Sequence, residues 1–228
     1  MPVAVVTGAS RGFGLAVVRA LAERGWESIV DARDGAALEA AIAGIPGATS
    51  VPGDVADPAH RDAIARAAAA RGRVDLLVNN ASTLGPSPRP PLAGYPLDAL
   101  RRVYEVNVLA ALGMAQALLP LLRPHGAIVN VTSDAGREAY EGWGGYGSSK
   151  AALDQVTAIL AAEHPELFVY SFDPGDMRTV MHQEAFPGED ISDRADPADV
   201  APLLVRLVDD GLPSGRYAAA ELAAGVAL

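Results

Sequence analysis

The sequence has no cysteine, far fewer basic than acidic side chains and no long apolar run. Without cysteine the chain forms no disulfide and offers no thiolate to a metal, so nothing in it requires an oxidising compartment. The four histidines are scattered without the spacing of metal ligands, and no metal site is predicted. A net charge of −10 lacks the positive footprint typical of proteins that bind nucleic acid.

The sequence pattern also shows no targeting segment. The first residues, Met1-Pro-Val-Ala-Val-Val-Thr-Gly, carry no basic n-region and lead directly into a strand-like run. No stretch approaches the roughly 18 uninterrupted apolar residues of a membrane span. We therefore expect a soluble, cytoplasmic protein with no membrane partner.

Lysine is nearly missing: of the 18 lysine and arginine side chains, Lys150 is the one lysine. It follows Tyr146 by four residues, and residues four apart on a helix share a face. An ammonium beside the phenol would lower the pKa of Tyr146 and make it a usable general acid or base. A genome rich in G and C would also explain the scarcity of lysine, and the spacing occurs by chance on many helices.

Short β-branched runs alternate with longer helical patterns along the chain. Apolar strands separated by helices indicate a parallel sheet covered on both faces, which is a doubly wound α/β (Rossmann) fold. The length favours a single domain over residues 1–228. The predicted strands and helices are, in order, Val3–Val6, Gly14–Arg24, Ser28–Asp31, Ala36–Ala43, Thr49–Val51, Ala59–Arg71, Val74–Val78, Leu97–Leu122 with a break near Pro120, Ala127–Val131, Gly145–Glu163, Phe168–Phe172 and Pro197–Asp209.

Two stretches interrupt this alternation and are predicted to be loops. Residues 83–96 are rich in proline, and residues 177–197 are polar with little periodicity. Ligands of open α/β sheets bind at the carboxyl ends of strands, where we place both stretches. We interpret them as loops that enclose a substrate.

The first predicted strand leads into a glycine-rich turn, Thr7-Gly-Ala-Ser-Arg-Gly-Phe-Gly14, which opens a helix. Glycines there let the backbone turn tightly and approach a pyrophosphate, which the free N–H groups and the dipole of the helix stabilise. The spacing is Gly-x-x-x-Gly-x-Gly rather than Gly-x-Gly-x-x-Gly. Its position directly after the first strand favours dinucleotide binding over a merely tight connection.

Further motifs follow in a fixed order along the chain. Each alone has an ordinary explanation, such as a turn or a helix cap. Together with the glycine turn they make the chain resemble the short-chain dehydrogenase/reductase family from Val3 to about Tyr217. The motifs are Asp54-Val55, Asn79-Asn80-Ala81, Asn107, Ser133, Tyr146 with Lys150, and Pro174-Gly175, with Ser133 preceding Tyr146 by 13 residues.

The resemblance implies hydride transfer between a nicotinamide cofactor and a carbonyl or secondary alcohol. Tyr146 would be the general acid or base, and Ser133 would stabilise the charge that develops on the substrate oxygen. Lys150 would hold the nicotinamide ribose hydroxyls while it lowers the pKa of Tyr146. Asn107 would support a water that returns the proton through Lys150.

The end of the second predicted strand bears on the choice between NADP and NAD. NAD-preferring members hold the ribose 2′-hydroxyl with an acid about 20 residues after the glycine turn, whereas arginine accommodates a 2′-phosphate. Ala32 aligns with the acid position, Arg33 follows it and Arg11 adds a second cation, which favours NADP. A shift by one residue would instead place Asp31 there and favour NAD. The cofactor contacts implied are Gly8, Ser10, Arg11, Gly12, Phe13, Gly14, Arg33, Asp54, Val55, Asn80, Ala81, Tyr146, Lys150, Pro174, Gly175 and Thr179.

The substrate is only weakly indicated by the sequence. Thr179 resembles the family residue that binds the nicotinamide carboxamide. Trp143 and Met177 would suit an apolar or cyclic ketone, although both are also ordinary packing residues. One departure from the family pattern is Ser82, which stands where glycine usually follows Asn-Asn-Ala and would alter the loop near the nicotinamide ribose.

These observations lead us to expect an NADP-dependent reductase of a small-molecule ketone, or the reverse alcohol dehydrogenase, assembled as a homodimer or homotetramer. One alternative is a catalytically silent dinucleotide-sensing protein on the same fold, against which the complete catalytic set argues. Another is an epimerase or dehydratase with internal redox, and the lack of a sugar-nucleotide domain speaks against it. The small residues of the 145–163 helix would pack against a partner copy, or against the chain's own sheet.

Overall fold

The computed structural model describes residues 1–225, and the last three residues of the predicted domain lie outside this range. A seven-stranded parallel sheet forms its centre. The predicted doubly wound fold is therefore confirmed. The strands are β1 (Val3–Val6), β2 (Glu27–Val30), β3 (Ala48–Ser50), β4 (Val74–Asn79), β5 (Leu122–Val131), β6 (Phe168–Asp173) and β7 (Gly215–Ala218).

The strands lie in the order β3-β2-β1-β4-β5-β6-β7. The direction of winding therefore reverses between β1 and β4, the place where open α/β sheets form a ligand crevice. Val5 of β1 is in register with Leu77 of β4, so the segments that follow these two strands emerge side by side. The glycine turn and the Asn80 loop are thereby brought together.

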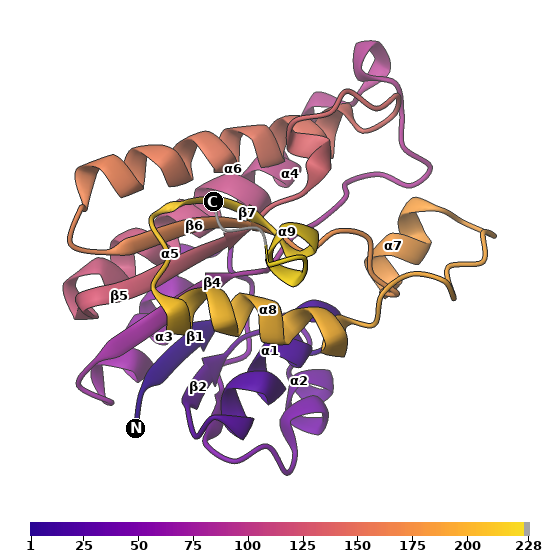
Figure 1. Cartoon of the computed structure of the whole chain (residues 1–228). Coiled ribbons are helices and arrows are strands. Elements are labelled where there is room, and N and C mark those ends of the chain that lie inside the picture. The colour runs from indigo at the N-terminus through magenta and orange to yellow at the C-terminus, as the bar shows by residue number, and fades with distance from the viewer. Residues whose placement is uncertain (226–228) are drawn as a thin grey trace.

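Helices cover both faces of the sheet, as Figure 1 shows for α8 and α1 on one side and α6 on the other. Strand residues alternate between the two cores: Ala4 and Val6 pack toward α1 and α8, whereas Val3 and Val5 pack toward α3, α5 and α6. The helices are α1 (Gly12–Glu23), α2 (Gly35–Ile42), α3 (Pro58–Ala69), α4 (Leu97–Tyr104), α5 (Ala110–Leu118), α6 (Gly144–Glu163), α7 (Val180–Ala185), α8 (Pro197–Asp210) and α9 (Ala219–Ala223).

The structure adds β7 and α9 after the last predicted helix, and it differs from the sequence-based expectation most clearly in three further segments. The stretch 177–197 contains the short helix α7, whose first turn Thr179 caps by accepting a hydrogen bond from the His182 N–H group. Strand β5 begins at Leu122, five residues earlier than expected, and its pairing with β4 shifts register on the way. The prediction of pure loop for 83–96 also misses a 3-10 turn at Leu92–Gly94.

The long helical path between β4 and β5 is continuous from Leu97 to Leu121 but not uniform. A π-helical segment, Glu105–Leu109, joins α4 to α5, and a 3-10 turn containing Pro120 ends the path. By length and composition this stretch would suffice to cross a membrane, with a mean hydropathy of 1.3. In this protein 44% of its most apolar window is buried, because α5 packs on the sheet beside α3.

Candidate active site

A cavity of about 880 Å³ opens at the carboxyl ends of the central strands. Residues far apart in the sequence line it, because consecutive strands of a parallel sheet all end at this edge. Nearly every residue predicted to bind a cofactor or to act in catalysis reaches this cavity. Asn107 and Gly14 are the exceptions, since neither lines the cavity. The predicted residues that line the cavity are Gly8, Ser10, Arg11, Gly12, Phe13, Arg33, Asp54, Val55, Asn80, Ala81, Ser133, Tyr146, Lys150, Pro174, Gly175 and Thr179.

Gly14, like Asn107, does not line the cavity, and its role is to let α1 approach the sheet. A Cβ on Gly14 would come within 2.5 Å of both the Gly8 carbonyl oxygen and the Asn80 amide nitrogen. Asn80 fixes this arrangement by donating from Nδ2 to the carbonyl oxygens of Thr7 (2.9 Å) and Gly8 (3.0 Å). Asn80 therefore shapes the glycine turn from the neighbouring strand.

The glycine turn has the backbone conformation that its sequence predicts. Gly8 and Gly12 adopt φ angles of +69° and +56°, a region that other L-residues rarely occupy. The place of a Cβ on Gly12 faces Thr179, whose side chain is 3.6 Å away across the cavity wall. Gly12 also opens α1, so the free N–H groups of the first helical turn lie at the cavity. This cradle fits the pyrophosphate of a dinucleotide.

Both carboxylate oxygens of Asp31 contact other residues of the protein. This bears on whether Asp31 could stand at the acid position that favours NAD. Its carboxylate accepts a hydrogen bond from the Gly8 N–H group (2.7 Å) and lies 3.1 Å from Nε2 of the buried His60. With both oxygens engaged and only 2% of its surface exposed, Asp31 buttresses the glycine turn. Arg33 and Arg11, in contrast, are exposed at the cavity.

The same end of the cavity holds a second pair of charges. Asp54 forms an ion pair with Arg102 from α4, and both residues line the cavity. Burial raises the pKa of Asp54, but the Ala56 N–H group, the hydrogen-bonded Arg102 and the charge of Arg33 outweigh this and hold it below the ordinary value. The predicted Asp54 is thus an ionised acceptor beside cations.

Tyr146 lies near the N-terminus of α6 with 9% of its surface exposed. Burial raises the pKa of its phenol far above the ordinary value, and hydrogen bonds with the Ser133 and Ser82 hydroxyls offset only part of that rise. Lys150 is not among the groups that shift this pKa here, so its expected lowering of the Tyr146 pKa stays a prediction. The phenol is firmly protonated here, which suits a proton donor.

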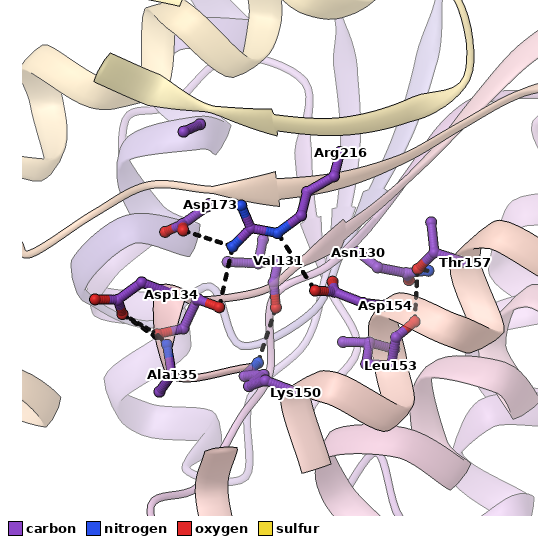
Figure 2. A network of polar contacts seen from close by, with 12 residues as sticks. Asn130, Val131, Asp134, Ala135, Lys150, Leu153, Asp154, Thr157, Asp173 and Arg216 are labelled. Atoms are coloured by element: carbon purple, nitrogen blue, oxygen red, sulfur yellow. Dashed lines mark hydrogen bonds and ion pairs between the residues drawn. The ribbon is translucent and has the colours of Figure 1, made fainter. Parts of the chain in front are cut away.

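Lys150 extends beneath the Tyr146 ring, with Nζ 5.4 Å from the ring centroid, as the spacing of four predicts. Its ammonium donates to the carbonyl oxygen of Val131 in β5 at 2.8 Å (Figure 2). Only 2% of the residue is exposed, and burial lowers the pKa of Lys150 to about 8, against the opposing effect of Asp154 and Asp173.

Ser133 follows β5 and begins a short 3-10 turn, Asp134–Gly136. Its hydroxyl donates to the Asp134 carboxylate at 2.9 Å and accepts from the Ala135 N–H group at 3.2 Å. Tyr140 donates to the other carboxylate oxygen of Asp134 at 3.0 Å. The Ser133 hydroxyl thus reaches both the phenol and a neighbouring carboxylate.

Asn107 lies in the π-helical segment with 1% of its surface exposed. Its amide nitrogen donates to the Thr83 carbonyl (3.0 Å) and the Ser149 hydroxyl (2.9 Å), and its oxygen accepts from the Thr83 N–H group (2.9 Å) and Ser82 (3.2 Å). These four bonds use the full capacity of the side chain. Asn107 therefore holds the Ser82–Thr83 loop against α6, and a water bound beside it would have to use its backbone.

The segment after β6 closes the other side of the cavity. Gly175, at a φ angle of +71°, turns the chain so that Thr179 faces the glycine turn. His182 on α7 lies 3.6 Å from Asp176, with its side chain 10% exposed. Around Tyr146 the walls are apolar; Leu84, Ala135 and Ala185 form a small cluster there, with Trp143, Met181 and Phe186 against it.

Three residues of this site were not recognised from the sequence. Ser82 was noted only as a departure from the family pattern, yet it contacts Asn107 and Tyr146. Asp173 and Arg216 form an ion pair of 2.7 Å beside Lys150. Asp173 could have been found from its position directly before Pro174-Gly175. No sequence signal pointed to Arg216, because it reaches the site only through the pairing of β7 with β6.

The arrangement can deliver a proton to an oxygen atom placed between two hydroxyl groups. The Tyr146 phenol and the Ser133 hydroxyl share one end of the cavity, with a buried ammonium behind them. The other end offers a glycine cradle, the exposed arginines Arg11 and Arg33, and Asp54. One cavity therefore combines an acid–base group with a site shaped for a phosphate-containing ligand.

Sequence relatives match this chain over 60% to 96% of its length. An uncharacterized oxidoreductase of Escherichia coli K12 is 37% identical over 141 residues, which span 60% of this chain and 55% of that protein. L-xylulose reductase of Bos taurus is 32% identical over 225 residues, which cover 96% of this chain and 84% of the reductase.

Solved structures agree with these sequence relatives. A protein assigned as a short chain dehydrogenase from Escherichia coli CFT073, in complex with NADPH, superposes with a TM-score of 0.90 at 30% identity. The match covers 96% of each chain. The profile of the short chain dehydrogenase family matches residues 2–190. The chain therefore belongs to the short-chain dehydrogenase family.

Proposed function

We propose that the protein is an NADP-dependent carbonyl reductase in which Tyr146 is the general acid. The observation that carries this proposal is the grouping of Tyr146, Ser133 and Lys150 at one end of a cavity whose other end has a glycine cradle. The family membership supports hydride transfer as the reaction, and a bound nicotinamide nucleotide would supply the hydride.

The charges at the glycine turn support NADP over NAD. Arg33 and Arg11 are exposed at the cavity, where guanidinium groups suit a 2′-phosphate. Asp31, the acid that would favour NAD in the shifted alignment, is buried and bonded to Gly8 and His60. The related Escherichia coli CFT073 protein was crystallised with NADPH, which is consistent with this choice.

The chain's own groups would act on the substrate carbonyl in a simple way. The protonated phenol of Tyr146 donates a proton to the carbonyl oxygen, and the Ser133 hydroxyl donates a hydrogen bond to the same atom. The Lys150 ammonium lies behind the ring and stabilises the phenolate left by that transfer. Asn107 keeps the Ser82–Thr83 loop in position at the edge of this site.

The substrate we propose is a small-molecule ketone or the matching secondary alcohol. Apolar side chains around Tyr146, among them Leu84, Trp143 and Met181, favour an apolar group next to the carbonyl. The substrate loops would be residues 83–96 and 177–197, which approach each other where Arg89 donates to the Ala185 carbonyl at 2.5 Å. Relatives named as reductases of L-xylulose and of 3-oxoacyl-[acyl-carrier-protein] are consistent with carbonyl reduction.

We also propose that the enzyme works in the cytoplasm as a homodimer or homotetramer. Exposed apolar side chains on the helical layer of α4 to α6, namely Leu97, Leu109 and Ile159, support a partner copy on that face. Light scattering of the purified protein would give the oligomeric state. A monomer at micromolar concentration would contradict this part of the proposal.

The decisive experiment replaces Tyr146 with phenylalanine. NADPH oxidation is followed against a panel of ketones, and NADPH binding is measured separately by fluorescence titration. Loss of the general acid should lower kcat by about 100- to 10,000-fold while the NADPH affinity stays within about twofold. Tyr104→Phe on α4 is the matched control and should keep full activity.

Two results would contradict the proposal at different levels. A Tyr146→Phe protein that still turns over would show that another group supplies the proton. A wild-type protein that binds NADPH but reduces no carbonyl in the panel would support the silent, dinucleotide-sensing alternative. Interconversion of a substrate without net NADPH consumption would instead indicate internal redox.

A further inference from the structure

Arg216 is a nearly buried arginine on β7, the last strand of the sheet, and 14% of its side chain is exposed. Figure 2 shows its guanidinium between Asp173 and Asp154, close to Lys150. No substrate-facing role follows from its position, because it does not line the cavity. Its contacts nevertheless lead to three separate parts of the candidate active site.

The first two contacts come from one nitrogen of the guanidinium. Nη2 donates to the backbone carbonyl oxygen of Ser133 at 3.1 Å and to the Asp173 carboxylate at 2.7 Å. Ser133 carries the hydroxyl that reaches Tyr146, and Asp173 immediately precedes Pro174 in the turn that leads to Thr179. The guanidinium therefore ties the end of β5 to the end of β6.

The third contact leads to the helix that carries the catalytic pair. Nε of Arg216 donates to Asp154 at 3.3 Å, and Asp154 follows Lys150 by one helical turn on α6. A single guanidinium thus connects the Ser133 backbone, the β6 turn and the Lys150 helix. The planar fork of arginine makes three such bonds possible, which the point charge of lysine does not match.

The charges around Lys150 give this geometry a chemical consequence. Asp154 and Asp173 both favour the charged form of Lys150, and Asp173 and Asp134 both oppose ionisation of Tyr146. Arg216 is the cation paired with Asp154 and Asp173. The charged and titratable groups that face the pair are Asp154 from α6, Asp173 from β6, Asp134 after β5, Arg216 from β7, and Asp176 and His182 across the cavity.

We propose that Arg216 is a positioning residue of this active site, which holds the Ser133 backbone in place and neutralises the carboxylates beside Lys150. It acts through these groups and touches neither substrate nor cofactor. Its effect on turnover rests on the function proposed above. Its effect on the charge state of Lys150 does not.

The single lysine of the chain makes the second effect directly measurable. Protein labelled with ε-¹³C-lysine gives one side-chain signal, and its titration reports the pKa of Lys150 without any turnover. The wild-type value should be about 8. In Arg216→Gln the two carboxylates lose their partner, so the pKa of Lys150 should rise by about one unit.

Two further variants separate charge from packing. Arg216→Gln combined with Asp173→Asn removes one freed carboxylate and should bring the pKa of Lys150 back toward the wild-type value. Arg24→Gln is the matched control, because it removes an arginine from the surface ion pair with Asp209. It should leave the Lys150 titration unchanged.

The turnover experiment uses the same variants with NADPH and a ketone that the wild type reduces. Measured in the alcohol-oxidising direction, the rise of kcat/KM with pH should move by about one unit to higher pH in Arg216→Gln. The double variant should restore the position of the profile while kcat stays low, since the Ser133 carbonyl remains unpaired. Arg216→Lys should move the rise of kcat/KM part of the way back to the wild-type pH.

The outcomes decide the proposal in each case. The proposal is overturned if the Lys150 titration is unchanged in Arg216→Gln, or if the double variant does not reverse the shift. Arg216 would then only stabilise the packing of β7. If Arg216→Gln alone does not fold, the double variant is compared with Asp173→Asn, which keeps Arg216. An equal pKa of Lys150 in these two proteins overturns the proposal. A wild type without turnover would defeat the proposed function, while the Lys150 titration still decides the role of Arg216.

Discussion

At the scale of single residues, Lys150 shows the tension between stability and chemistry most clearly. Its ammonium is almost completely buried, and burial lowers the pKa of Lys150 from an ordinary 10.5 to about 8. A shift of this size means that the folded protein disfavours the charged form by roughly 3 kcal/mol. The hydrogen bond to the Val131 carbonyl and the nearby carboxylates keep the charge in place.

Replacing Lys150 with methionine should therefore leave the protein at least as stable as the wild type at pH 7, although turnover is lost. The difference depends on pH in a defined direction. Below about pH 8 the wild type carries the full cost of the buried charge, and this cost disappears as the pH rises from about 8 to 10.5. Urea unfolding of both proteins at several pH values measures this cost. If their free energies of unfolding differ by the same amount from pH 8 to 10.5, the lowered pKa of Lys150 is contradicted.

The second residue-scale prediction keeps the charge at position 150 but changes its shape. Lys150→Arg should lower kcat by about 100-fold or more, because a broad guanidinium does not fit the buried space below the Tyr146 ring. Tyr146 and Ser133 would be displaced with it. Kinetics of the variant alongside its NADPH affinity test this; near-normal kcat would show that only the charge matters.

At the scale of elements, a buried polar chain joins the centre of the sheet to α6. Asn79 of β4 donates to Asn130 of β5 at 2.8 Å, and Asn130 donates to Thr157 of α6 at 2.9 Å. Thr157 in turn donates to the Leu153 carbonyl, as Figure 2 shows. This chain fixes how α6, which carries Tyr146 and Lys150, lies on the sheet.

Replacing Asn130 with leucine should lower the free energy of unfolding by about 2–3 kcal/mol, because buried polar groups on both neighbours lose their partner. Ser28→Ala is the matched control. Ser28 is equally buried in the same sheet, but its hydroxyl has no hydrogen-bond partner within residues 1–225, so the change should stay within about 0.5 kcal/mol. Equal losses in both variants would show that sheet packing, not the polar chain, sets the stability.

Elements with a strong pattern of their own were predictable from the sequence, and those that depend on tertiary contacts were not. Strand β4 is largely apolar, and α6 has a long helical pattern, so both were recovered to within about one residue. Helix α7 was missed because its six residues lie in a polar stretch and are stabilised mainly by the Thr179 cap. The early start of β5 at Leu122 depends on pairing with Val74, which local sequence does not specify.

At the scale of the whole molecule, the parallel sheet explains why so much of the site was predictable. Motifs that follow consecutive strands must meet at one edge, so the order of Gly8, Asn80, Ser133 and Pro174 along the chain already implied a shared cavity. What the order did not specify was how side chains are used inside it. Asp31 turned out to be bonded within the protein, and Arg216 enters the site only because β7 pairs with β6.

The choice of nucleotide should be visible in the stability of the whole molecule. A ligand that binds only the folded state stabilises it by about 2.7 kcal/mol at a concentration 100 times its Kd, which for a chain of 228 residues raises Tm by roughly 5–10 °C. If Arg33 and Arg11 hold a 2′-phosphate, NADPH should raise Tm by several degrees more than NADH at the same concentration.

Arg33→Ala should remove much of that difference without lowering Tm in the absence of nucleotide, because Arg33 is exposed at the cavity. The loss of a charged contact to phosphate weakens NADPH binding by about tenfold or more, whereas NADH binding lacks that contact and should hardly change. Arg24→Ala, remote from the cavity, should preserve the full difference between the two nucleotides. A larger shift with NADH than with NADPH in the wild type would instead favour NAD, and it would require Asp31 to leave Gly8 and His60 when the nucleotide binds.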